Sequence, residues 1–274
     1  MSKRILGVAI WLAAISSIPA YAEDNLGFRV KTGISYVDYT VPGGFLANNT
    51  TPVNVELRTR YQASNLGLAY ASPEGSFFDF TVRQDTGHAT WDSGKGLASL
   101  SGWSNVAQKQ KAQRTEYTVT VGSAISETVQ LFGGYQASNY QVNATVDAMN
   151  SATGLPLGTL SFTNYIAMSG IFGGLSKAIR LGNGALNING SFSLMSALTE
   201  CQADFVSAGT AIMPNRTTKN YSSGLGYGLG ASYTYPINTM FSLVTDLKYH
   251  SYKPDKYPKA DRSKSLGLNL ITSF

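Results

Sequence analysis

Hydrophobic and polar residues alternate with a period of two along most of the chain that follows the first 22 residues. In the segment 26–36, one face carries Leu26, Phe28, Val30, Ile34 and Tyr36. The opposite face carries Gly27, Arg29, Lys31, Gly33 and Ser35. Alternation of this kind predicts a β-strand with one apolar and one polar face, because successive side chains of a strand point to opposite sides.

The same pattern recurs often enough to predict ten strands in an antiparallel meander, with twelve as the alternative count. The predicted strands cover 26–41, 53–72, 77–92, 113–125, 129–140, 159–177, 185–196, 222–235, 240–252 and 264–274. Tight turns near 73–76, 126–128, 181–184 and 236–239 alternate with long polar stretches at 42–52, 93–112, 141–158, 197–221 and 253–263. Strict alternation of short and long connections places all the long loops at one end of the meander.

The second predicted strand changes parity, because its apolar positions are odd up to Tyr61 and even from Leu66 onward. A β-bulge within 62–65 would restore a single apolar face. The alternative is a separate tight turn at this point, which would move the stretch 93–112 to the short-turn end.

A soluble β-sandwich also alternates, but several features favour a membrane protein. The polar faces are charged or rich in glycine, the strands run about ten or more residues, and aromatic residues gather near the strand ends. Candidates for such aromatic girdles are Phe28, Phe77, Tyr233, Tyr235, Phe241, Tyr36, Tyr39, Tyr135 and Tyr249. The sequence therefore predicts an all-β fold, a transmembrane antiparallel up-and-down β-barrel with its apolar face toward lipid.

The last predicted strand alternates Leu266, Leu268 and Leu270 with small or polar residues and ends in Phe274. In this respect the chain resembles the Gram-negative outer-membrane β-barrel proteins of about 8 to 12 strands. The resemblance implies that Phe274 is an assembly signal for the barrel-assembly machinery. It also implies short turns in the periplasm, long loops outside the cell, and lipopolysaccharide around the outer half of the barrel.

The first 22 residues differ from the rest and predict a cleaved signal peptide, 1–22, ahead of a barrel domain, 23–274. Lys3 and Arg4 precede an apolar run at 5–15, which is too short to span a bilayer, and Ala20-Tyr21-Ala22 forms a small-x-small cleavage site. We therefore expect export through the periplasm to the outer membrane. A lone Cys201 excludes an internal disulfide.

Only 14% of the residues are charged, and the net charge of +5 is spread along the chain. This distribution excludes a dedicated nucleic-acid binder and leaves no motif for a cofactor. The charges of the strands are predicted to line the lumen at Arg29, Lys31, Glu56, Arg58, Arg60, Asp79, Arg83, Asp85, Arg114, Glu116, Asp246 and Lys248.

The predicted lumen allows two interpretations. Its charges pair into a network that fills a narrow barrel, or they line a porin-like path for small solutes or ions with a weak preference for anions. Four glycines on one polar face, Gly224, Gly226, Gly228 and Gly230, favour open space. The primary hypothesis is a narrow channel.

Outside the membrane we predict a basic rim made by Lys253, Lys256, Lys259, Arg262 and Lys264. This rim favours pairing with lipopolysaccharide phosphates, or an adhesin that binds a host polyanion through its extracellular loops. An outer-membrane hydrolase is a second alternative, with catalytic candidates Asp85, His88, Asp92, Asp246 and His250. Because the chain lacks closely spaced Asp-x-Asp and Asp-x-His pairs, we expect no enzyme activity and assign no catalytic or metal-binding residue.

Overall fold

The computed structural model describes residues 27–43, 55–85, 90–91, 103–150, 153, 155–207, 210–255 and 260–274. The predicted signal peptide, 1–22, lies outside the described residues. The strands are β1 (Gly27–Gly43), β2 (Val55–Ala71), β3 (Ser76–Asp85), β4 (Thr90–Trp91), β5 (Trp103–Ala124), β6 (Val129–Asn150), β7 (Pro156–Leu181), β8 (Gly184–Ser207), β9 (Thr210–Pro236), β10 (Phe241–Pro254) and β11 (Asp261–Ser273). Among these residues, no helix is long and apolar enough to span a bilayer.

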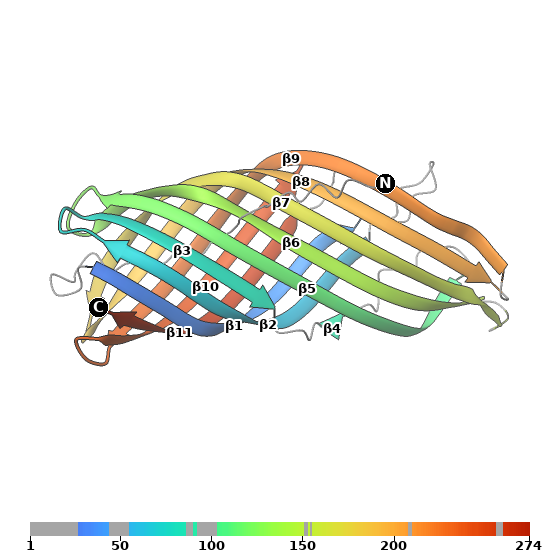
Figure 1. Cartoon of the computed structure of the whole chain (residues 1–274), viewed down its shortest axis with the longest axis horizontal. Coiled ribbons are helices and arrows are strands. Elements are labelled where there is room, and N and C mark those ends of the chain that lie inside the picture. Colours follow the sequence, from blue (N-terminus) through green and yellow to red (C-terminus); the bar gives the residue numbers. More distant parts are fainter. Residues whose placement is uncertain are drawn as a thin grey trace, which may run out of the picture.

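The strands close into a single antiparallel barrel (Figure 1). Apart from the two-residue β4, each strand pairs with the strands before and after it, and β1 pairs with both β2 and β11, which leaves no open edge where the ring closes. Strands β3 and β4 both pair with β2, so they are two parts of one strand. The predicted ten-stranded up-and-down barrel is therefore confirmed.

Five strands are longer than predicted. Strands β5 to β9 continue past the other strands at the long-loop end and form a projecting sheet (Figure 1). The expected loops at 93–112, 141–158 and 197–221 are therefore wrong wherever the structure describes them. The parts that form strands instead are 103–112, 141–150, 156–158, 197–207 and 210–221. The outward face of the projecting sheet carries polar residues, so the alternation that marks a lipid-facing strand is missing there.

The predicted bulge in the second strand is also wrong. The register of β2 against β1 runs without a shift from Gly27↔Ala71 to Gly43↔Val55, which excludes the alternative turn as well. Tyr61, only 2% exposed, points into the barrel, while Arg60 points outward. Tyr61 looks lipid-facing in sequence, but its ring fits equally well inside a barrel lumen.

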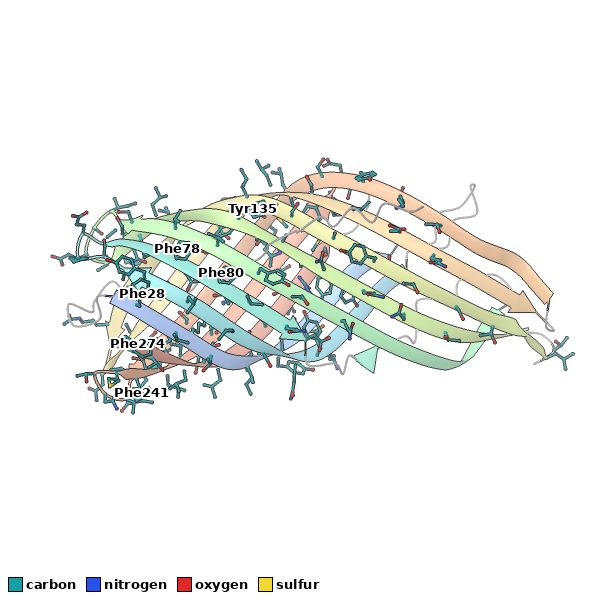
Figure 2. The ribbon with its side chains drawn as sticks, viewed as in Figure 1. Phe28, Phe78, Phe80, Tyr135, Phe241 and Phe274 are labelled. Carbon is teal, nitrogen blue, oxygen red and sulfur yellow. The ribbon has the colours of Figure 1, made fainter. Side chains whose placement is uncertain are left out.

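The outward face of the barrel forms an apolar band. Its exposed members include Phe28, Ile34, Leu66, Leu68, Phe78, Leu131, Tyr135, Ile171, Leu175, Ile188, Phe192, Leu194, Leu225, Leu229, Leu247, Leu266, Leu268 and Leu270. Several project from the ribbon in Figure 2, and Phe192 is 79% exposed. Soluble proteins rarely expose contiguous apolar surface on this scale, so the band is the lipid-facing surface of the barrel.

The C-terminal residue closes this surface at the short-turn end. The Phe274 ring is exposed with the outward aromatics (Figure 2), and its backbone N–H donates to the carbonyl oxygen of Phe28 at 3.0 Å. Two predicted girdle residues, Phe77 and Tyr39, point inward instead and are buried. Their positions are described below.

Candidate functional site

The barrel interior collects most of the charged side chains that the sequence predicts there. The residues found on the inward face are Arg29, Lys31, Asp79, Arg83, Asp85, Arg114, Glu116, Asp246 and Lys248. Arg60 is a wrong assignment, because the continuous register of β2 turns it outward, with its side chain 44% exposed. The side chains of Glu56 and Arg58 lie outside the described residues.

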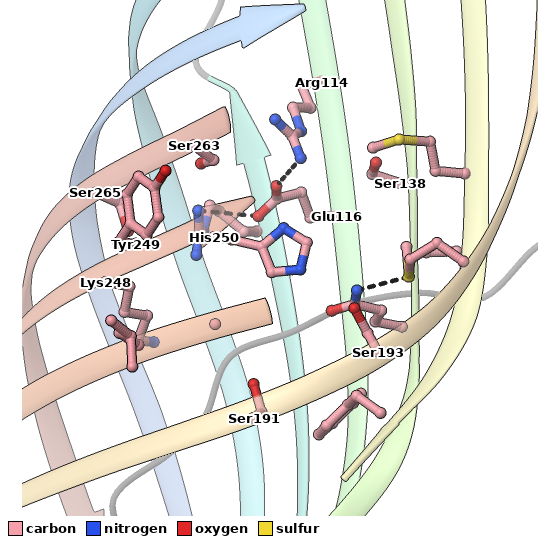
Figure 3. Close-up of a pocket in the computed structure, with 18 residues that line it drawn as sticks. Arg114, Glu116, Ser138, Ser191, Ser193, Lys248, Tyr249, His250, Ser263 and Ser265 are labelled. Atoms are coloured by element: carbon pink, nitrogen blue, oxygen red, sulfur yellow. Dashed lines mark hydrogen bonds and ion pairs between the residues drawn. The ribbon is translucent and has the colours of Figure 1, made fainter. Parts of the chain in front are cut away.

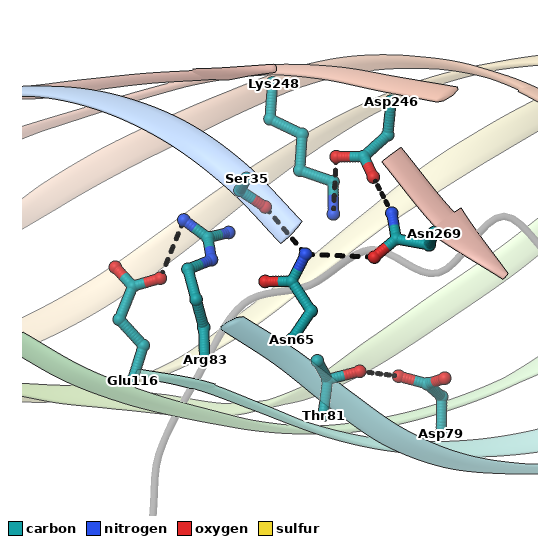
Figure 4. Close-up of polar contacts among 9 residues, drawn as sticks. All are labelled: Ser35, Asn65, Asp79, Thr81, Arg83, Glu116, Asp246, Lys248 and Asn269. Carbon is teal, nitrogen blue, oxygen red and sulfur yellow. Dashed lines mark hydrogen bonds and ion pairs between the residues drawn. The ribbon is translucent and has the colours of Figure 1, made fainter. Parts of the chain in front are cut away.

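Glu116 is held between two arginines. Its carboxylate lies 2.9 Å from Arg83 Nη1 and 2.6 Å from Arg114 Nη2 (Figures 3 and 4), and all three side chains are nearly excluded from solvent. Arg83 and Glu116 are direct cross-strand partners on β3 and β5. Charge-assisted bonds of this kind are short and strong, so Glu116 fixes the positions of both guanidinium groups.

A second polar network joins strands β10, β11, β2 and β1 (Figure 4). Asp246 lies 3.4 Å from Lys248 Nζ and accepts a hydrogen bond from Asn269 Nδ2 at 2.6 Å. Asn65 Nδ2 donates to Asn269 Oδ1 at 2.9 Å and to Ser35 Oγ at 2.7 Å. The side chains of this network therefore satisfy one another's buried polar groups.

Glycine at position 33 makes the second network possible. Gly33 on β1 is the register partner of both Asn269 on β11 and Asn65 on β2. A Cβ atom at this position would collide with Asn269 Oδ1 and with the Leu268 carbonyl oxygen. The two asparagines can therefore meet over β1 only because that strand has no side chain between them.

Gly228 lines the cavity described below, but the glycines of β9 open the lumen less than expected. A Cβ on Gly226 would meet Ser193 Oγ, and one on Gly228 would lie 2.7 Å from Ser191 Oγ. The hydroxyl side chains of β8 thus occupy the space that the glycines leave. Glycine at these positions allows the inward serine side chains of β8 to pack closely against β9.

A tyrosine cluster crosses the lumen at the long-loop end. The rings of Tyr39 on β1 and Tyr140 on β6 make an edge contact, with centroids 5.3 Å apart. The Arg114 guanidinium lies 3.9 Å from the centroid of the Tyr39 ring, a cation–π geometry. The Tyr39 hydroxyl donates to Asp261, and the Tyr140 hydroxyl donates to Thr59 Oγ1 at 3.2 Å. Because β2, β3 and β5 separate β1 from β6, the contact spans nearly opposite walls of the ten-stranded ring.

An apolar cluster fills part of the interior near the short-turn end. It comprises Ala71, Phe77, Phe132 and Phe172, and the Phe132 and Phe172 ring centroids lie 6.3 Å apart. A Cβ on Gly174 would lie 2.6 Å from the Cζ atom of Phe132, so the tip of that ring occupies the space beside the glycine. The assignment of Phe77 to the lipid girdle is therefore wrong, since lipid-facing and lumen-facing aromatics cannot be separated by residue type alone.

A cavity of about 80 Å³ lies in the interior and is lined by Arg83, Arg114, Glu116, Lys248 and His250, together with several serines (Figure 3). It has room for a few water molecules. Within the described residues, Arg114 Nε and Nη1 have no hydrogen-bond partner. The lining of the cavity therefore carries three basic side chains, Arg83, Arg114 and Lys248, against one carboxylate, and its other members include apolar side chains such as Met168, Phe172 and Met195.

The catalytic candidates do not form one constellation in the described part of the chain. His250 lines the cavity with Glu116, whereas Asp246 is bonded to Lys248 and Asn269. His88 and Asp92 lie outside the described residues. Among the residues that the structure describes, no group of three or more His, Cys, Asp or Glu side chains could hold a metal ion.

The predicted basic rim is described only in part. Lys253, Arg262 and Lys264 are exposed at the long-loop end of β10 and β11. Lys256 and Lys259 lie outside the described residues. These cations could be predicted because basic residues are closely spaced in this part of the sequence. The position of Arg60 on the outer surface could not be predicted in that way.

No family model matches the chain, and no curated protein matches it either. Among solved structures, the chain is similar to the translocator domain of the autotransporter NalP from Neisseria meningitidis, with a TM-score of 0.52 and 11% identity over 92% of this chain and 90% of that one. It is also similar to the outer membrane protease OmpT from Escherichia coli, with a TM-score of 0.52 and 10% identity over 90% of this chain and 97% of that one. At these identities the likeness concerns architecture alone, and the chain has the fold of the outer-membrane β-barrel proteins.

Proposed function

We propose that the protein is an integral outer-membrane barrel that binds a partner at the cell surface through its long-loop end and does not act as an open channel. The observation that carries this proposal is the contact between Tyr39 and Tyr140 across the lumen. Barrels of about eight strands enclose little more than side-chain volume, and a ten-stranded barrel is only slightly wider. Two rings that meet from nearly opposite walls leave little width for solutes at that level.

The projecting sheet supplies a surface that supports partner binding. Gln141, Tyr165, Glu200 and Lys219 form one outward row across β6 to β9. Glu200 and Lys219 are paired at 3.0 Å, and the nearby Tyr221 is 65% exposed. Amide, hydroxyl and tyrosine side chains are typical of recognition surfaces, because they combine adaptable hydrogen bonding with contact area at low entropic cost.

Shortening the two projecting hairpins tests partner binding. In the variant, an Asn-Gly turn replaces residues 141–165 and another replaces 198–221, because Tyr140 pairs with Ile166 and Ala197 with Ser222. We expect vesicles that carry the intact protein to bind immobilised heparin, fibronectin or laminin, and the shortened barrel to lose at least about tenfold of that binding.

The shortened variant must still shift its electrophoretic mobility on boiling, as a closed barrel does when it unfolds. Equal binding by the intact and shortened proteins contradicts the proposal. Failure of the intact protein to bind any of the three surfaces also contradicts it.

Removing the two rings of the tyrosine cluster is expected to change the conductance of the barrel. The intact protein should give no steady current steps in planar bilayers, whereas the Tyr39→Ala/Tyr140→Ala variant should give steady steps, because both rings that cross the lumen are removed. The matched control, Tyr36→Ala/Tyr135→Ala, removes two outward tyrosines and should stay silent.

A narrow channel is the second candidate function, and the basic cavity favours it. Arg83, Arg114 and Lys248 line that cavity, and such groups stabilise anions in a low-dielectric path. Steady steps from the intact protein with a preference for anions would replace the proposal above by this one.

A further inference from the structure

Strand β9 forms one margin of the projecting sheet (Figure 1). Strand β8 pairs with β9 as far as Thr210, whereas the pairing of β10 with β9 ends where Pro254 meets Gly224. In the part of the chain that the structure describes, no strand pairs with the second side of β9 over 210–222. An unpaired strand edge is a template for another strand. We call residues 217–223, which lie just past Leu225 of the apolar band, the open edge.

The last hydrogen bond between β10 and β9 shows which backbone groups face away from β8. The N–H of Asp255 donates to the carbonyl oxygen of Ser223 at 2.8 Å, so the backbone groups of Ser223 face the side of β10. Alternate residues of an antiparallel strand present their N–H and C=O groups to the same neighbour. The N–H and C=O groups of Tyr221, Lys219 and Thr217 therefore face the unpaired side. Among the described residues, these groups have no backbone partner there.

The side chains of the open edge are accessible and carry one cation. Thr217, Lys219, Tyr221 and Ser223 are all exposed on the outward face of β9. Lys219 pairs with Glu200 of β8, yet its side chain remains 56% exposed. A lysine on an edge disfavours pairing with a second copy of the same edge, because like charges then come together. The open edge is therefore suited to a strand of a different sequence.

We propose that the open edge binds an extended peptide segment of the surface partner, which adds as a strand antiparallel to β9. This inference rests on the proposed function above. In this mode of recognition, main-chain hydrogen bonds supply the affinity and alternate side chains of the peptide supply the specificity. An acidic side chain opposite Lys219 and a β-branched or aromatic one opposite Tyr221 fit the outward row. The partner segment therefore has an apolar residue two positions before an acidic one.

The test measures binding of the peptide Ser-Thr-Val-Thr-Glu-Thr-Thr-Ser to the purified barrel in detergent. The Thr217→Pro/Tyr221→Pro variant should bind at least about tenfold more weakly than the matched control, Thr217→Ala/Tyr221→Ala. Both variants lose the same side chains, but only proline removes the two N–H donors that face the unpaired side. Proline is tolerated where a strand N–H faces solvent, so the sheet should remain intact. Equal binding by the two variants, or no binding by the unaltered protein, overturns the proposal.

A charge reversal tests the same site without proline. Replacing the glutamate of the peptide with lysine should weaken binding to the unaltered protein several-fold, and Lys219→Glu should reverse the order of the two peptides. An unchanged order in Lys219→Glu contradicts the proposal even if the proline variant fails to fold, which the mobility shift on boiling reveals. A concentration-dependent dimer of the unaltered barrel that the proline variant abolishes would assign the open edge to a second copy and overturn the proposal.

The protein surfaces used above separate this inference from the proposed function. If fibronectin or laminin binds through this edge, the proline variant should lose that binding as the shortened barrel does. Retained binding by the proline variant, with loss in the shortened barrel, supports the proposed function and contradicts strand addition. Binding to heparin alone does the same, because a polysaccharide has no peptide backbone to pair. Peptide binding that depends on the two edge N–H groups, without binding to any of the three surfaces, supports strand addition and contradicts the proposed function.

Discussion

Replacing Glu116 with glutamine is expected to lower the free energy of unfolding by about 3–5 kcal/mol. The carboxylate lies within 3 Å of Arg83 and of Arg114, and all three side chains are nearly buried. Glutamine keeps the shape but removes the charge, so two buried guanidinium groups lose their shared counter-ion. Urea unfolding of the barrel in lipid vesicles measures the loss.

The matched control is Glu200→Gln on the projecting sheet. Glu200 also pairs with a cation, Lys219 at 3.0 Å, but that pair is exposed. Exposed pairs contribute about 0–1 kcal/mol, so this variant should unfold almost like the unaltered protein. If Glu116→Gln is equally mild, the interior is hydrated enough to screen its charges, and the filled-lumen interpretation fails.

Replacing Leu268 with arginine is expected to cost about 2–4 kcal/mol, the penalty for a cation facing the middle of the bilayer. Leu268 lies between Leu266 and Leu270 in the apolar run of β11, and its side chain is exposed on the outward face. The guanidinium would have to leave water for hydrocarbon, or else thin the bilayer around it. Urea unfolding in vesicles and the yield of folded barrel both measure this effect.

The control for this position is Leu268→Met, which keeps an apolar side chain of similar volume. It should cost less than about 1.5 kcal/mol. An arginine variant as stable as the methionine variant would mean that this face of β11 does not meet lipid, and the apolar band would then need another explanation.

Much of the fold could be predicted because lipid and lumen impose opposite demands on neighbouring residues. On β3, for example, Phe78 and Phe80 alternate with Asp79 and Thr81, and the structure turns the two sets to opposite sides as expected. The tight turns likewise indicate which end of the meander has the short connections. The number of strands and most of the inward charges could therefore be predicted from the two-residue alternation and the positions of the tight turns alone.

The remaining errors share one cause, which is that lumen residues need not be polar. Tyr39, Tyr61 and Phe77 were assigned outward because their rings are apolar, yet all three are buried inside the barrel. Whether these rings face the lipid or the lumen depends on how their strands pair with distant strands. That pairing cannot be inferred from the sequence. The contact between Tyr39 and Tyr140 was hidden for the same reason.

The lengths of β5 to β9 were not predicted for a different reason. Past the membrane, the outward residues such as Gln141 and Asn143 meet water, so polar side chains appear on the face that would otherwise be apolar. A polar stretch without alternation is typical of a loop. Here the hydrogen bonds between strands hold it in a sheet instead.

The network around Gly33 has a consequence for the order of assembly. Asn65 and Asn269 are separated by 204 positions in the chain, and their hydrogen bond crosses the strand at which the ring closes. The rest of the sheet can form from neighbouring hairpins, but this bond, like the whole ladder between β1 and β11, must wait until β11 has reached β1. Protection of the Asn65 side-chain amide from hydrogen exchange therefore reports completion of the barrel and distinguishes a finished ring from an open sheet of paired hairpins.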